Sequence, residues 1–63
     1  MNKLKENKQQ IEMCINLLYQ IWSGKLIPLQ AMFYEILITE KLKDLTGRNI
    51  INIDELEAEL EEL

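Results

Sequence analysis

The side chains with the most chemistry to offer are carboxylates, which gather at the end of the chain as Asp54, Glu55, Glu57, Glu59, Glu61 and Glu62. Carboxylates hold divalent cations and act as general acids or bases. Their spacing does not match a calcium-binding loop of the EF-hand type, because the central glycine and the ordered series of oxygen ligands are absent. We therefore expect neither a metal site nor any other cofactor.

Nucleophilic catalysis also lacks its usual groups. The chain has no histidine, one cysteine and two glycines, so it contains no serine–histidine or cysteine–histidine pair and no glycine-rich phosphate loop. Cys14 falls within an apolar helical stripe and is expected to be a small buried hydrophobic residue. The sequence thus predicts a protein that is not an enzyme.

Length restricts how such a chain reaches stability. Its 63 residues, 48% of them hydrophobic, form one domain at most. A core of this size rarely supplies more than about 3–5 kcal/mol without a crosslink, a metal or a partner. A lone cysteine excludes a disulfide within the chain, and the lack of histidine excludes the common zinc spacings. Oligomerisation remains, and we expect a homodimer or small oligomer.

Apolar periodicity predicts an all-α fold. Spacings of three, four and seven indicate a helix over residues 2–23, which Gly24 ends as a left-handed cap. A second helix, over residues 28–46, begins at Pro28 and ends at Gly47. Because the connection between them is short, the two helices are expected to form an antiparallel hairpin.

The helix over residues 28–46 carries apolar side chains on two nearly opposite faces. The first face, expected to pack on the helix over residues 2–23, consists of Leu29, Met32, Phe33 and Ile36. The second face has heptad-like spacing and consists of Ala31, Tyr34, Ile38, Leu42 and Leu45. The C-terminal helix or a second copy of the chain is expected to cover it, and we predict these five residues as the oligomer interface.

A short acidic helix is predicted over residues 53–62, with Asn52 as its N-cap. It is too short to be stable alone and must dock on the hairpin or on a partner. Residues 52–63 contain no basic side chain, so this helix either presents a solvated face or binds a partner with a basic surface. The candidate partner-binding residues are Glu55, Glu59 and Glu62.

An alternative function is binding to nucleic acid. An antiparallel hairpin would bring the basic side chains of its two ends together, namely Lys3, Lys5, Lys8, Lys41, Lys43 and Arg48. A net charge of −4 argues against strong contact with phosphates, and the second helix is too apolar for a recognition helix.

The sequence also predicts where the protein acts. It shows neither a signal peptide nor an apolar segment long enough to span a membrane, and a lone thiol suits a reducing compartment. We expect a single helical domain in the cytoplasm. Its predicted role is that of a small interaction or regulatory protein, with no membrane partner.

Overall fold

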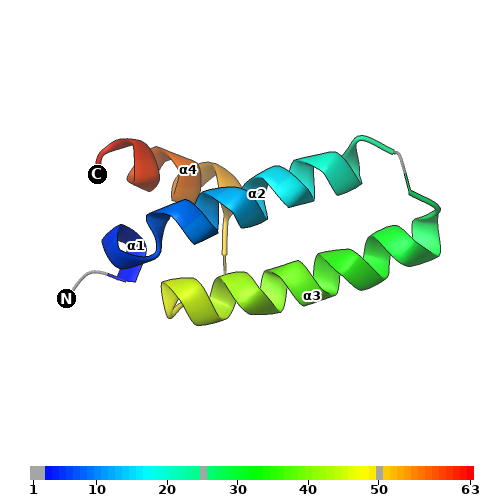
Figure 1. Ribbon diagram of the computed structural model, residues 1–63, viewed down its shortest axis with the longest axis horizontal. Helices are drawn as coiled ribbons and strands as arrows, with labels where there is room; N and C mark the ends of the chain where they lie inside the picture. Colours follow the sequence, from blue (N-terminus) through cyan, green and yellow to red (C-terminus); the bar gives the residue numbers. More distant parts are fainter. Residues whose placement is uncertain (1–2, 25, 50) are drawn as a thin grey trace.

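The computed structural model describes residues 3–24, 26–49 and 51–63, and these residues form helices without any strand (Figure 1). The helices in chain order are α1 (Lys3–Glu6), α2 (Lys8–Trp22), α3 (Pro28–Thr46) and α4 (Ile53–Glu61). The prediction of an all-α chain is confirmed.

Most helix ends lie where local chemistry predicts them. Pro28 opens α3 after Ile27, whose ψ of 151° is the extended geometry favoured before proline. Gly24 and Gly47 adopt positive φ angles of 84° and 71°, which place them in the left-handed region where a side chain would be strained. The side-chain oxygen of Asn52 caps α4 by accepting hydrogen bonds from the N–H groups of its first turn.

The helix predicted over residues 2–23 is corrected by the structure. Residue 2 lies outside the described residues, and the helix is broken at Asn7, whose φ of −108° and ψ of 16° separate α1 from α2. The Asn7 side-chain amide donates a 2.9 Å hydrogen bond to the carbonyl oxygen of Leu45, in the last turn of α3. Carbonyls at a helix C-terminus lack partners within the helix. The break therefore has a tertiary cause that local sequence does not reveal.

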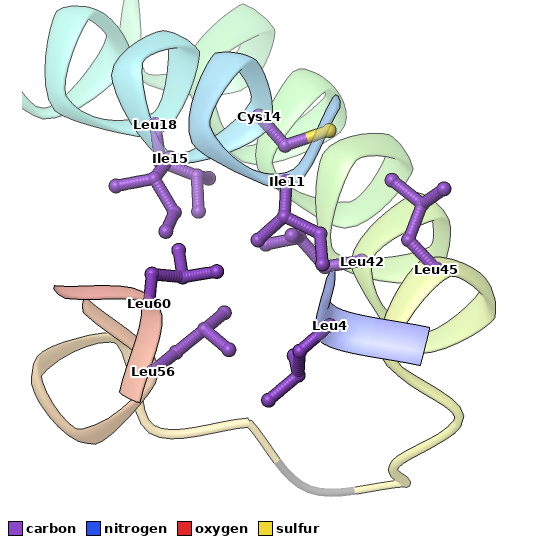
Figure 2. Close-up of a cluster of buried hydrophobic side chains, with 9 residues drawn as sticks. All are labelled: Leu4, Ile11, Cys14, Ile15, Leu18, Leu42, Leu45, Leu56 and Leu60. Atoms are coloured by element: carbon purple, nitrogen blue, oxygen red, sulfur yellow. The ribbon is translucent and has the colours of Figure 1, made fainter. Parts of the chain in front are cut away.

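Helices α2 and α3 lie side by side and run in opposite directions, with α4 beside the first half of α2 and α1 across the end of the pair (Figure 1). The core occupies the end of the molecule where all four helices meet. Figure 2 shows leucines of α4 pointing toward those of α2, α3 and α1. The buried cluster consists of Leu4, Ile11, Cys14, Ile15, Leu18, Leu42, Leu45, Leu56 and Leu60.

The first face of α3 does not pack on α2 as predicted, whereas the C-terminal part of the second face is covered within the chain, where the C-terminal helix was one of the two covers expected. Leu42 and Leu45, predicted for an oligomer interface, are 1% and 8% exposed within the core of a single chain. The face predicted to pack on α2 is in contrast turned to solvent, and its Leu29 is 74% exposed. Leucines of α4 determine which face of α3 turns inward, because they pack with the C-terminal part of the second face to complete the core.

Replacing Leu42 by alanine should lower the free energy of unfolding by about 2–5 kcal/mol, since it removes a fully buried side chain. Met13→Ala, at an exposed position of α2, serves as the control and should change that free energy by less than about 0.5 kcal/mol. Urea titration followed by circular dichroism measures both. Similar losses in the two variants would contradict the placement of the core.

Candidate apolar interaction surface

The first half of α3 is apolar on every side. Over residues 29–38 only Gln30 and Glu35 are polar. A helix that is apolar all round normally lies inside a protein core. Here four side chains, which we call the outer stripe, point into solvent with 55–74% of their surface exposed: Leu29, Met32, Phe33 and Ile36.

A groove runs beside the outer stripe, between the second half of α2 and the first half of α3. It encloses about 500 Å³ and is lined by Leu17, Gln20, Ile21, Leu26, Tyr34, Leu37 and Ile38. Within the described part of the chain, none of its lining residues belongs to α4 or carries a charge. Two residues of the predicted interface, Tyr34 and Ile38, lie in this groove. Ala31 is half-buried on the same helix.

The four aromatic side chains of the chain lie outside the buried core. Each lies within an edge-to-face pair on its own helix, Tyr19 with Trp22 at 5.7 Å between ring centroids and Phe33 with Tyr34 at 6.1 Å. All four are 45–61% exposed. They add to the apolar surface at this end of the molecule.

Polar contacts tie the acidic helix to the body of the protein. Arg48 donates a 2.6 Å hydrogen bond to Glu59 within an ion pair, and the Tyr19 hydroxyl donates to the carboxylate of Glu57. Glu59, predicted to bind a partner, is therefore already engaged within the chain. Glu55 and Glu62 are exposed.

The basic side chains proposed for nucleic-acid binding do not form a free patch. Lys8 pairs with Glu12 at 3.8 Å, Lys43 pairs with Glu40 at 3.5 Å, and Arg48 is held as described above. The remaining three, Lys3, Lys5 and Lys41, are exposed. Half of the predicted set is thus neutralised locally by carboxylates.

Reactive and metal-binding groups are sparse in the part of the chain that the structure describes. There, no three cysteine, aspartate or glutamate side chains come together in a way that would hold a metal ion. Cys14 is buried in the core cluster. Burial raises the pKa of its thiol, an effect that the positive charge of Lys41 partly offsets. A raised pKa leaves less of the reactive thiolate at neutral pH.

No protein-family model, curated protein or solved structure matches this chain. Within the described residues, no helix combines the length and the apolar character needed to cross a membrane.

Sequence reasoning missed most of the groove and the exposure of the outer stripe. Leu17 and Leu37 fall beside rather than on a regular apolar stripe, and Leu26 lies in the connection between α2 and α3. Only the α3 side of the groove has a signal in the sequence, because residues 29–38 are too apolar on all sides for a helix with only one neighbour.

Replacing Glu57 by glutamine should lower the pKa of Tyr19. The hydrogen bond to Glu57 raises that pKa above 10.0, and desolvation and the negative charges of Glu57 and Asp54 raise it further. The bond stabilises the fold only while the phenol is protonated. Its contribution is complete below the ordinary tyrosine pKa and is lost as pH rises through the raised one.

The measurement is the ultraviolet difference absorbance of tyrosinate in a Tyr34→Phe background, where Tyr19 is the only tyrosine. The same titration in urea gives the unfolded reference. If the Tyr19 titration is identical with and without the Glu57→Gln substitution, α4 does not dock beside Tyr19.

Proposed function

We propose that this chain is a small non-catalytic protein–protein interaction or regulatory protein that acts as a homodimer or small oligomer. The observation that carries the proposal is the first half of α3, which is apolar on every side and yet exposed. The largest apolar patch on a typical monomer covers about 300–600 Å² and is often functional. Here the outer stripe lies on α3 next to the groove between α2 and α3. Their closeness favours burial of this apolar surface against another polypeptide.

Stability supports self-association. Burial of apolar surface contributes roughly 25 cal/mol per Å² to stability. The core of this chain is small, and the most apolar segment of α3 lies outside it. A partner that covers this segment supplies the stabilisation that a single core of this size lacks. A reducing, cytoplasmic location is part of the proposal, and the buried free thiol suits it.

A heterologous partner with a basic surface is a further part of the proposal. Glu55 and Glu62 are exposed on or next to α4, which carries no basic residue, so they offer negative charge that no side chain in the described residues already binds. Glu59 would first have to leave Arg48. The nucleic-acid alternative has no comparable support, because Lys8, Lys43 and Arg48 already face carboxylates.

Static light scattering over a micromolar to millimolar concentration series should show a mass of twice the 7.5 kDa of the chain or a small multiple of it. Circular dichroism at each point should show helicity falling as the complex dissociates, because dilution removes the cover from α3. A helical monomer at every concentration would contradict self-association.

A further inference from the structure

We infer that a second copy of this chain covers the outer stripe, with the two α3 helices packed antiparallel about a two-fold axis near Phe33. This inference rests on the self-association proposed above and names its surface. It replaces the interface predicted from sequence, because Leu42 and Leu45 are buried within one chain.

The outer stripe has the spacing of a helix–helix seam. Leu29, Phe33 and Ile36 are four and three residues apart, which is the heptad alternation that keeps one side of a helix against a partner. These side chains form a ridge on one helix, and their high exposure shows that contacts within the chain hardly use them. The groove residues Tyr34 and Leu37 are about half exposed and would gain less from a new partner.

The available area matches the needs of a stable dimer. About 100 Å² for each half-exposed large side chain gives the outer stripe together with Leu37 about 500 Å² of apolar surface per copy. A standard interface buries about 800 Å² per partner, of which roughly three-fifths is non-polar. The two figures agree, so the stripe and Leu37 supply the apolar part of a standard interface.

Charges at the end of the stripe select the antiparallel direction. Glu40 continues the seam four residues after Ile36, and a parallel pair would place it opposite Glu40 of the second copy. Like charges in such a position disfavour the pairing, and the exposed ion pair of Glu40 with Lys43 on its own helix, at 3.5 Å, offsets this only in part. An antiparallel pair centred on Phe33 instead places each Glu40 beside the start of α3 in the other copy, where the helix dipole is positive.

Closed symmetry sets the position of the axis. In a two-fold interface the same surface appears on both sides, so the stripe buries itself fully only when the axis passes through its middle. Met32 and Phe33 form that middle, between Leu29 and Ile36. Phe33 then meets its own counterpart, whereas Leu29 meets residues near Leu37 of the second copy.

The first test compares charged substitutions at exposed positions by light scattering. Phe33→Lys and Ile36→Lys should weaken the dimer at least about tenfold, as expected for central interface residues, while helicity at high concentration shows that the chain still folds. Met13→Lys is the matched control, because this side chain is exposed on α2 and does not line the groove, and this variant should remain dimeric.

The second test does not depend on a destabilising charge. In a Cys14→Ala background, Phe33→Cys should form a disulfide-linked dimer under mild oxidation much faster than Leu29→Cys. Antiparallel packing separates the two copies of position 29 by about 12 Å along the axis, beyond the roughly 7 Å between Cα atoms that a disulfide spans. Equal rates at the two positions would overturn the antiparallel arrangement.

The outcomes separate this inference from the proposed function. If the wild-type chain is an oligomer that neither Phe33→Lys nor Ile36→Lys dissociates, the stripe is not the interface, but self-association stands. A wild-type monomer at all concentrations overturns both. A monomer that also co-sediments with phosphatidylcholine vesicles assigns the apolar surface to lipid instead of to a second copy.

Discussion

A difference in helix length determines the architecture. α4 has nine residues and α3 has nineteen, which correspond to about 13 Å and 28 Å. Even with α1 beside it, α4 covers only the end of the hairpin that holds the buried cluster. The rest of α3 is more apolar than the end in the core, yet among the described helices it has only α2 as a neighbour. The molecule therefore has two unlike halves. In the closed half, α1, α4 and the adjoining ends of α2 and α3 bury a core. In the open half, α2 and α3 have no further helix of the described residues to cover them.

The closed half is held by polar contacts at its edges as well as by leucines. Asn7 and Thr46 together satisfy two carbonyl oxygens in or near the last turn of α3, those of Leu45 and Leu42. Arg48 and Tyr19 bind the carboxylates of α4. Two of the residues involved, Arg48 and Glu59, are ones that the sequence first offers as binding groups, so the basic and acidic sets contribute less to the free surface than their number suggests.

Sequence reasoning succeeded where structure is decided locally. Pro28, Gly47 and Asn52 act within one turn of their own position, so their roles follow from residue type alone. The face of α3 that enters the core could not be found in this way, because residues 29–38 are apolar all round and favour no direction. Only the position of Leu56 and Leu60, on a separate helix, decides it. The break at Asn7 is likewise invisible in a local window, since its partner is 38 residues away.

The Asn7 bond has a consequence for the order in which the chain acquires its structure. α1 is a single turn of four residues, far below the length at which a helix persists in water. It becomes ordered only where α2 and α3 already present the carbonyl of Leu45 and the pocket for Leu4. The hairpin must therefore form before the N-terminal turn can join it. Among the described helices, α1 and α4 are both too short to persist alone, so both settle on a hairpin that is already formed.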